Sequence, residues 1–385
     1  LIKSITMKHS IKFYPVGNGD CCLVNIGGAN KKMMFDCNFR QQAENEDEEM
    51  YDVLADLLDN ELTGKKCGLN FLHAFLLPHP DQDHCRSFSE KFYLGSPDAI
   101  KDEDKEKKKI LIGELWYSPR VLEEQTHEIN ADAKAFKKEE KRRMDLYKSD
   151  PSKANSDGNR IRIIGWTDNP ELEGLEDRIV TPGNLISEVN GTSCRYFEMF
   201  IHAPFKDEIA GSDRNMTSIV TQLRFKSDEK DSEIARVFLA GDTEWRIIEK
   251  IMDKTEEDDL LKWDLLEAPH HCSYKFFADD REDDPNQATL DFLDKKESSA
   301  YVISSSKVNK KNSDNPPCQK AKNRYTDKVG SSNFLCTSGT SEDETDKPTI
   351  FDIEDGEVSL REDGKKAEAA LRSTSVSNTK PHYYG

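Results

Sequence analysis

Residues 71–84 have the sequence FLHAFLLPHPDQDH, an apolar run followed by a cluster of polar side chains. The apolar part, Phe71–Leu77, has the length and composition of a buried strand. The polar part contains His79, Asp81, Asp83 and His84. A strand that ends in imidazoles and carboxylates brings nitrogen and oxygen donors to one point at the edge of a sheet, and such donors bind divalent metals. The stretch therefore predicts a metal site at the end of a strand.

Three later segments also place ligand-type residues after an apolar stretch. Gly241 and Asp242 follow a strand-like run, His270 and His271 follow another, and Ser304–Ser306 follow a third. An α/β sheet builds its sites along the edge where its parallel strands end. We therefore expect these segments to face the same site as residues 79–84.

The order of these motifs resembles that of the metallo-β-lactamase fold hydrolases. Members of that superfamily carry HxHxDH after a strand, then a Gly-Asp strand end, then a late histidine, whereas this chain has Asp81 at the position of the second histidine. The variant is similar to one subgroup, which contains the hydrolase domain of the DNA-uptake competence proteins. The matching elements, in the order of that subgroup and within about residues 9–317, are Gly17–Asp20, Asp36, His79–His84, Asn215–Ser218, Gly241-Asp242 and His270–Ser273.

The chain departs from the subgroup in three places. Cys85-Arg86-Ser87 stands where glycines usually follow the Asp-His pair, and Cys272 replaces the glycine of His-His-Gly-Ser. The late Gly-His-Pro element appears as Asp314-Asn315-Pro316, without its histidine. The last departure leaves no counterpart for any substrate contact that this histidine makes in the family.

The resemblance implies an α/β fold, an αββα sandwich of the metallo-β-lactamase type, as a single domain over residues 9–360. It also implies a site for two divalent metal ions. His79 and Asp81 would bind the first metal, Asp83, His84 and His271 the second, and Asp242 both, with Asp83 and His270 as catalytic residues. The third ligand of the first metal stays open between His202 and Asn215. The many carboxylates favour Mn²⁺ or mixed metals, and Zn²⁺ stays an alternative.

Residues 96–160 and the end of the chain differ in composition from the rest. Lys101–Lys109 and Ala131–Lys148 are rich in both acids and bases, which is typical of a solvent-facing helical insertion rather than a basic patch. Trp116–Ser118 lies between them and is a candidate strand of the main sheet. The insertion offers a surface for a protein partner. Residues 361–385 are rich in Ser, Thr and Lys, and we expect a mobile tail there.

Composition narrows the class of protein. The formal net charge of −19 argues against a general electrostatic grip on nucleic acid or on an anionic membrane. No stretch approaches the roughly 18 apolar residues that a membrane helix needs. The nine cysteines form no CxxC pair, and an odd number is typical of a reduced, cytoplasmic protein.

The sequence therefore predicts a metal-dependent hydrolase that acts on a phosphodiester, in a nucleic acid or a nucleotide. The acidic net charge favours a small substrate, or a partner that supplies the grip on a long one. Because one fold hosts many reactions, hydrolysis of a lactone, thioester or amide is the alternative. A partner-gated module of a larger complex, for example in defence, is a third interpretation.

Overall fold

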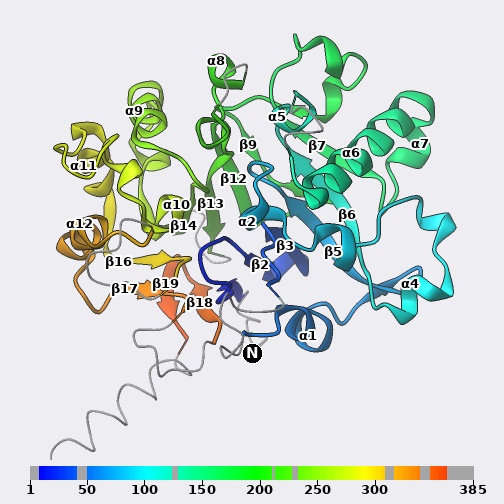
Figure 1. Ribbon diagram of the computed structural model, residues 1–385, viewed down its shortest axis with the longest axis horizontal. Helices are drawn as coiled ribbons and strands as arrows, with labels where there is room; N and C mark the ends of the chain where they lie inside the picture. Colours follow the sequence, from blue (N-terminus) through cyan, green and yellow to red (C-terminus); the bar gives the residue numbers. More distant parts are fainter. Residues whose placement is uncertain are drawn as a thin grey trace, which may run out of the picture.

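The computed structural model describes residues 8–40, 50–123, 129–209, 213–227, 233–307, 316–338 and 347–361. The tail predicted at 361–385 lies outside these residues except for Arg361, as do Asp314 and Asn315 of the late motif. Two sheets face each other in the described part, and helices cover their outer faces (Figure 1). No helix in this part combines the length and the apolar composition needed to cross a bilayer.

The first sheet is built mainly from the N-terminal half of the chain. Its strands are β1 (His9–Phe13), β2 (Cys22–Ile26), β3 (Lys31–Phe35), β4 (Lys65–Lys66), β5 (Leu69–Leu76), β6 (Ile110–Tyr117), β7 (Arg160–Ile164), β8 (Ile179–Val180), β18 (Thr349–Glu354) and β19 (Glu357–Leu360). Their order is β19-β18-β1-β2-β3-β5-β6-β7-β8, with β4 beside β5. From β3 to β8 the neighbours in this order are parallel, so these strands end at one edge.

The second sheet comes from the C-terminal half of the chain. Its strands are β9 (Leu185–Ile186), β12 (Phe197–Ala203), β13 (Val220–Lys226), β14 (Ile234–Leu239), β15 (Trp263–Glu267), β16 (Lys296–Ser304) and β17 (Phe334–Cys336). Their order is β17-β16-β15-β14-β13-β12-β9, and β14 to β17 are parallel. A separate hairpin pairs β10 (Glu188–Val189) with β11 (Thr192–Ser193).

The core between the sheets follows from the period of two along each strand. In β3, Met33 and Phe35 face the second sheet, where Leu223 and Leu265 belong to the same buried cluster. Met34, between them, points the other way into the cluster under the helices. Each large apolar side chain buried in this way stabilises the fold by roughly 1.5–3 kcal/mol.

Helices form the two outer layers. The first sheet is covered by α1 (Val53–Asp56), α3 (Phe88–Lys91) and α6 (Ala131–Ser149), and the second by α9 (Trp245–Lys254), α11 (Gln287–Leu293) and α12 (Gln319–Val329). Shorter helices are α2 (Gln82–Cys85), α4 (Asp102–Glu106), α5 (Arg120–Glu123), α7 (Pro151–Ala154), α8 (Lys206–Ile209) and α10 (Pro269–Cys272). Single turns are η1 (Gly27–Ala29), η2 (Leu57–Glu61), η3 (Pro97–Ala99), η4 (Pro170–Leu172), η5 (Glu176–Arg178), η6 (Asn215–Thr217), η7 (Asp258–Leu260) and η8 (Tyr274–Phe276). In Figure 1, α9, α11 and α12 lie left of the sheets and α6 and α7 lie right, which confirms an α/β sandwich.

The segment 96–160 agrees only in part with the predicted solvent-facing insertion around a candidate strand at Trp116–Ser118. Residues 101–108 are mostly exposed and the candidate strand is present in β6, but α6 is not solvent-facing on all sides. Every residue of β6 is buried, and β6 lies between β5 and β7 in the first sheet. One face of α6 is buried as well, through Ala133, Phe136, Glu139, Glu140, Arg143, Met144 and Tyr147. Three of these residues are charged, so the buried face does not appear as an apolar stripe in the sequence.

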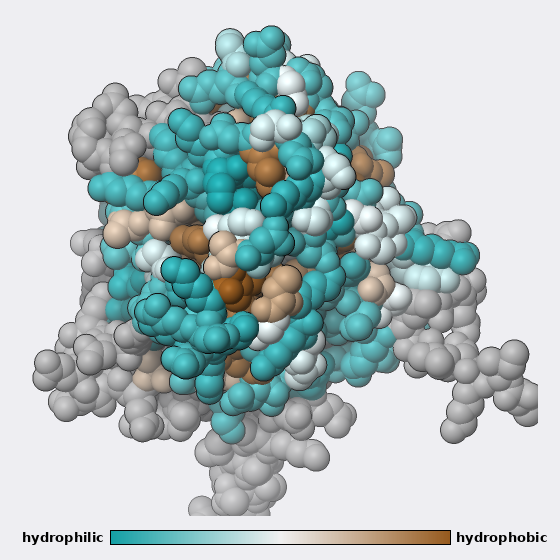
Figure 2. Space-filling model, turned by 90° about the vertical axis from the view of Figure 1, so that its right-hand side faces the viewer, coloured by the Kyte–Doolittle hydropathy of each residue, from teal (hydrophilic) through white to brown (hydrophobic). Residues whose placement is uncertain are grey.

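The outer surface on this side of the molecule is polar. Figure 2 shows the right-hand side of Figure 1, where α6 and α7 lie, and most of the visible residues are hydrophilic with a small central group of hydrophobic ones. The charged residues of the segment therefore fall into two groups. Some lie on this surface in contact with solvent, and others lie on the buried face of α6.

Candidate metal centre

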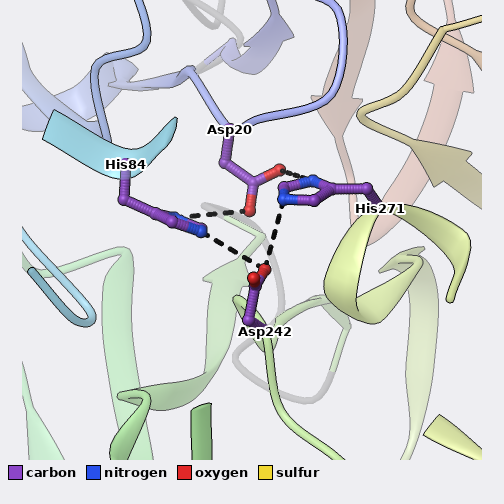
Figure 3. Close-up of side chains that lie close together, drawn as sticks. All are labelled: Asp20, His84, Asp242 and His271. Carbon is purple, nitrogen blue, oxygen red and sulfur yellow. Dashed lines mark ion pairs between the residues drawn. The ribbon is translucent and has the colours of Figure 1, made fainter. Parts of the chain in front are cut away.

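Four ligand-type side chains from separate segments meet at the edge where the parallel strands end (Figure 3). They are Asp20, His84, Asp242 and His271, all buried, and one ligand atom from each lies within 4.8 Å of the others. His84 lies in α2 after β5, Asp242 follows β14, and His271 lies in α10 after β15. Asp20 comes from the turn between β1 and β2.

The two carboxylate oxygens of Asp242 face different pairs of imidazoles. Oδ1 lies 3.2 Å from Nε2 of His84 and 3.4 Å from Nε2 of His271. Oδ2 lies 3.6 Å from Nε2 of His270 and 3.9 Å from Nε2 of His79. Asp242 therefore stands between two groups of donors, one on each of its oxygens.

Asp81 and Asp83 lie on the open side of these groups. Asp81 Oδ2 is 3.7 Å from Nε2 of His79, and its Oδ1 accepts a hydrogen bond of 2.9 Å from Arg214. Asp83 Oδ2 is 3.2 Å from Nε2 of His271. The side chains of Asp81 and Asp83 are 31% and 35% exposed, whereas that of Asp242 is 6% exposed. Solvent thus reaches the site past these two carboxylates.

Asp20 was part of the predicted motif Gly17–Asp20 but was not named as a candidate ligand. Its Oδ1 lies 3.4 Å from Nδ1 of His271, and its Oδ2 lies 3.7 Å from Nδ1 of His84. The turn needs glycine at position 19, where φ is +141° and a Cβ would lie 2.9 Å from the carbonyl oxygen of Asp83. The Gly-x-Gly-Asp pattern was the available signal, because it lets the chain approach Asp83 closely enough to point Asp20 inward.

Two neighbouring groups orient the imidazoles. Asp36 Oδ1 lies 3.0 Å from Nδ1 of His84, and Ser218 Oγ lies 3.2 Å from Nδ1 of His79. A partner on Nδ1 fixes the ring and leaves Nε2 directed at the site, as around protein-bound metals. Both partners belong to the motifs predicted from the sequence. Asn215, by contrast, forms backbone hydrogen bonds near its own turn: its N–H donates to Asp213, and its carbonyl accepts from the N–H of Ser218.

His202, the other candidate for an open ligand position, lies elsewhere in the fold. It is buried on β12, its Nε2–H donates to the carbonyl of Leu260 at 3.1 Å, and its Nδ1 accepts from Thr255 at 3.4 Å. Both ring nitrogens are therefore engaged away from Asp242. Burial lowers the pKa of His202 to about 3, so the folded protein holds it neutral.

This burial predicts an acid-dependent loss of stability. Above pH 6.5 His202 is neutral in both states, whereas below it only the unfolded chain takes up the proton, so stability falls as the pH approaches 3. We expect His202→Gln, measured without metal, to lose about 2 kcal/mol less unfolding free energy than the wild type between pH 7 and pH 5. Urea unfolding of both proteins at the two pH values measures this difference. Equal losses in the two proteins would refute the assignment.

The charged groups of the site shift one another's pKa values. Burial alone would lower the pKa of His84, but Asp242 and Asp36 outweigh it and raise that pKa well above its usual value. His271 is also raised well above its usual pKa, because Asp242 and Asp20 outweigh its burial. Burial raises the pKa of Asp36 to about 7 against the pull of His84. Without a metal, the carboxylates therefore hold protons on His84 and His271, and a divalent cation supplies the same positive charge.

Several buried donor atoms fit a cation. Within the described part of the chain, Nε2 of His79, Nε2 of His84 and Oδ1 of Asp242 are buried without a hydrogen-bond partner. Orphaned buried polar atoms of this kind are rare in folded proteins. Their nitrogen and carboxylate chemistry is that of a divalent metal site. The residues present therefore fit one or more divalent metals.

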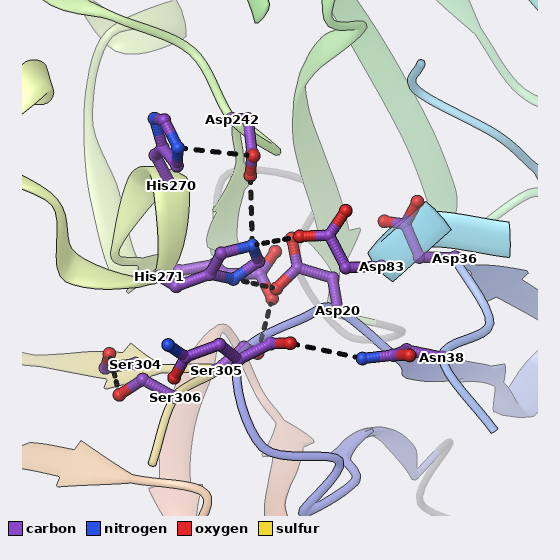
Figure 4. Close-up of polar contacts among 12 residues, drawn as sticks. Asp20, Asp36, Asn38, Asp83, Asp242, His270, His271, Ser304, Ser305 and Ser306 are labelled. Atoms are coloured by element: carbon purple, nitrogen blue, oxygen red, sulfur yellow. Dashed lines mark hydrogen bonds and ion pairs between the residues drawn. The ribbon is translucent and has the colours of Figure 1, made fainter. Parts of the chain in front are cut away.

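The backbone around the histidine pair is strained. His270, His271 and Cys272 have φ of +52°, +54° and +65°, in the left-handed region that residues with a side chain rarely enter. Such conformations cost about 1–3 kcal/mol each and gather at functional sites. The strain turns both imidazoles toward Asp242 (Figure 4).

The segment after β16 supports the site rather than forming it. Ser304 and Ser306 hydrogen-bond to each other at 2.8 Å (Figure 4). Ser305 donates a hydrogen bond of 3.1 Å to Glu267. Glu267 is buried, and its burial together with the charges of Asp20 and Asp36 raises its pKa well above the usual value. The serines thus supply a hydrogen bond to a buried acid next to the donor groups.

Comparison with known proteins gives weak structural similarities. The sequence matches no protein-family profile and no curated protein. An isothiocyanate hydrolase from Delia radicum gut bacteria is 10% identical, with a TM-score of 0.37 over 86% of this chain and 97% of that one. Unliganded yeast PDE1 is 11% identical, with a TM-score of 0.39 over 87% of this chain and 98% of that one. Identities and TM-scores this low do not identify the chemistry of the site, which depends on the side chains present.

Proposed function

We propose that the protein is a metal-dependent hydrolase of the metallo-β-lactamase type that cleaves a phosphodiester at a dinuclear centre. The observation that carries this proposal is the position of Asp242, whose two oxygens face separate imidazole pairs at 3.2–3.9 Å. A carboxylate between two donor groups is the arrangement by which two-metal sites hold their ions close together. Phosphodiester hydrolysis is a common use of such sites.

The donor atoms divide between two ions. His84, His271 and Asp20 would hold one metal with Oδ1 of Asp242, and Asp83 stands beside His271. His79, Asp81 and His270 would hold the other with Oδ2 of Asp242. In this division, His270 is the third ligand of the metal ion held by His79 and Asp81, the role for which the sequence offered His202 and Asn215. Metal ions bound there would lower the pKa of water and neutralise charge on the phosphoryl oxygens.

The protein's own residues supply positioning and proton transfer. The side chain of His270 is 22% exposed, and its Nε2 lies 3.6 Å from Asp242 Oδ2, so this nitrogen would either bind a metal ion or pass a proton to the leaving oxygen. Asp83 Oδ2, 3.2 Å from His271, keeps that imidazole turned toward Asp242 and faces solvent with its other edge. Asp36 and Ser218 hold the rings of His84 and His79 during the reaction.

The carboxylate-rich donor set favours Mn²⁺, with Zn²⁺ as the second choice. The net charge of −19 favours a nucleotide or another small phosphodiester over a long polynucleotide. Hydrolysis of a neutral lactone, thioester or amide is the competing function, and gating by a partner protein is a third.

The test uses purified protein with Mn²⁺ or Zn²⁺ on bis(p-nitrophenyl) phosphate, single-stranded DNA, RNA and cyclic nucleotides. We expect cleavage of at least one of these, and loss of that cleavage in Asp83→Ala. Hydrolysis of lactones or esters alone would favour the competing function. Activity on none of the phosphodiesters, with the metals bound, would contradict the proposal unless an added partner protein restores it.

A further inference from the structure

A second pocket lies at the edge of the first sheet opposite to the metal centre. It has a volume of about 360 Å³, and its walls come from η2, β4, the start of β5 and the connection between α4 and β6. The eight residues of β5 span roughly 25 Å from this pocket to the segment that carries His79 and His84. Figure 1 shows α4 at the right-hand edge of the molecule and α2 near its middle. A ligand in this pocket would therefore occupy a separate site.

The lining of this pocket is positively charged. Its charged side chains are those of Asp59, Lys65, Lys105, Lys108 and Lys109. Four cations beside one carboxylate contrast with the net charge of −19 for the whole chain. A hollow lined by charges of one sign concentrates ions of the opposite sign. The lining therefore favours an anionic ligand.

Two of the four lysines are held in place by the backbone and lack a carboxylate partner. Within the described part of the chain, neither Lys65 nor Lys108 forms an ion pair, and both are exposed. Lys65 is fixed by the pairing of β4 with β5, where it lies opposite Asn70. Lys108 has a φ of +51°, and its N–H donates to the carbonyl of Lys105 at 3.0 Å. The fold thus brings two uncompensated ammonium groups from separate segments to one pocket.

The other two lysines form only weak ion pairs. Lys105 lies across the turn before β5, where a Cβ on Gly68 would be 3.0 Å from its Cε, and its Nζ is 2.8 Å from Asp102. The side chain of Asp102 is 88% exposed, and exposed pairs contribute little. Nζ of Lys109 is 3.8 Å from Asp104, which is longer than a hydrogen bond. Both ammonium groups can therefore exchange these contacts for an anion.

The size and the rim of the pocket favour a short anion over a long one. A volume of about 360 Å³ lies at the small end of the range for small-molecule sites. The exposed acids Asp102, Glu103 and Glu106 lie on α4 beside the lysines, and they would repel a polynucleotide that ran on past the pocket. Lysine binds phosphoryl groups as a point charge, so several lysines around one hollow suit a ligand with several phosphoryl groups.

We propose that this pocket binds a short chain of two or three phosphoryl groups, either an inorganic polyphosphate or the phosphate chain of a nucleotide. The ligand would lie between Lys65 of β4 and Lys105, Lys108 and Lys109 of the connection between α4 and β6. The inference does not depend on the proposed function, because the pocket and the metal centre are at opposite edges of the sheet.

The experiment compares the wild type with a double variant, Lys65→Ala and Lys108→Ala, and with a matched control, Lys134→Ala and Lys138→Ala. Lys134 and Lys138 are exposed on α6 and do not line the pocket. Calorimetry measures the binding of tripolyphosphate, ATP and a single-stranded oligonucleotide without added metal, because phosphate chains chelate Mn²⁺. Acetylation of the wild type by acetic anhydride, with and without tripolyphosphate, shows by mass spectrometry which lysines the ligand covers.

We expect tripolyphosphate to bind the wild type and to protect Lys65 and Lys108 from acetylation, while Lys134 and Lys138 react as before. In the double variant we expect the affinity to fall at least about tenfold, because two charge-assisted contacts are lost. The control should stay within about twofold of the wild type. Equal affinities for tripolyphosphate and ATP would assign the binding to the phosphates alone, and tighter binding of ATP would identify a nucleotide as the source.

Three results would overturn the inference. The first is a wild type that binds neither tripolyphosphate nor ATP at about 1 mM. The second is binding that the double variant keeps, or that leaves Lys65 and Lys108 open to acetylation, since the anion would then lie elsewhere. The third is tighter binding of the oligonucleotide that the double variant loses, because the lysines would then belong to a nucleic-acid surface.

Discussion

Replacing Asp242 by asparagine is expected to lower kcat/KM for a phosphodiester by at least about 1,000-fold. Both oxygens of this carboxylate face imidazoles, His84 and His271 on one side and His79 and His270 on the other. The asparagine side chain keeps the shape of aspartate but loses its charge and one acceptor oxygen. Both donor groups then lose the carboxylate that they share. Steady-state kinetics on bis(p-nitrophenyl) phosphate with saturating Mn²⁺ measures the loss.

A matched control separates this effect from a general change of charge. Asp207 is 75% exposed and pairs with Lys250 on the surface, so Asp207→Asn removes one carboxylate outside the donor groups. We expect its activity to stay within about twofold of the wild type, since exposed ion pairs contribute little. An Asp242→Asn protein that is folded and keeps more than a tenth of the wild-type activity would contradict the role of Asp242.

Arg143→Met is expected to destabilise the fold by about 3–5 kcal/mol. Arg143 is 1% exposed, and its Nε bonds Oε1 of Glu139 at 2.8 Å. Its other nitrogens donate to the carbonyls of Ile112 and Arg160 at 3.1 and 3.0 Å, which ties α6 to β6 and β7. Methionine fills the space but carries no charge, so the buried carboxylate of Glu139 loses its ion pair with Arg143. The free energy of unfolding in urea measures the cost.

A double variant tests the cause of this loss. Replacing a buried ion pair at both positions by apolar residues is often close to neutral, whereas removing one partner is not. We therefore expect Glu139→Leu combined with Arg143→Met to regain about half or more of the lost stability. A single variant that costs less than about 1 kcal/mol would mean that α6 is a loosely attached insertion, as the sequence alone suggested.

The parts of the site that follow strands were predictable from the sequence. His79, His84, Asp242 and His271 come together because they follow β5, β14 and β15, and the parallel strands of each sheet end at one edge. Each of these strands ends in an apolar run that the sequence shows directly. The layered arrangement followed from the same pattern, since both faces of the parallel strands are buried.

Other features depended on information that the sequence pattern does not carry. Asp20 reaches the site from a turn, and its direction depends on the backbone angle of Gly19 and on the contact with Asp83. The buried face of α6 was hidden because Glu139, Glu140 and Arg143 occupy core positions. His202 was weighed as a ligand by residue type, but its neighbours Thr255 and Leu260 come from a distant segment that packs on β12.

The most direct test of the central claim is the number of manganese ions bound per chain. Elemental analysis after loading and gel filtration would compare wild type, Asp242→Asn and the control Asp207→Asn. We predict close to two ions in the wild type and the control, and a loss of at least about half of them in Asp242→Asn, because Asp242 belongs to both donor groups. A wild type that holds no metal, or an Asp242→Asn protein that holds as much as the wild type, would contradict the account.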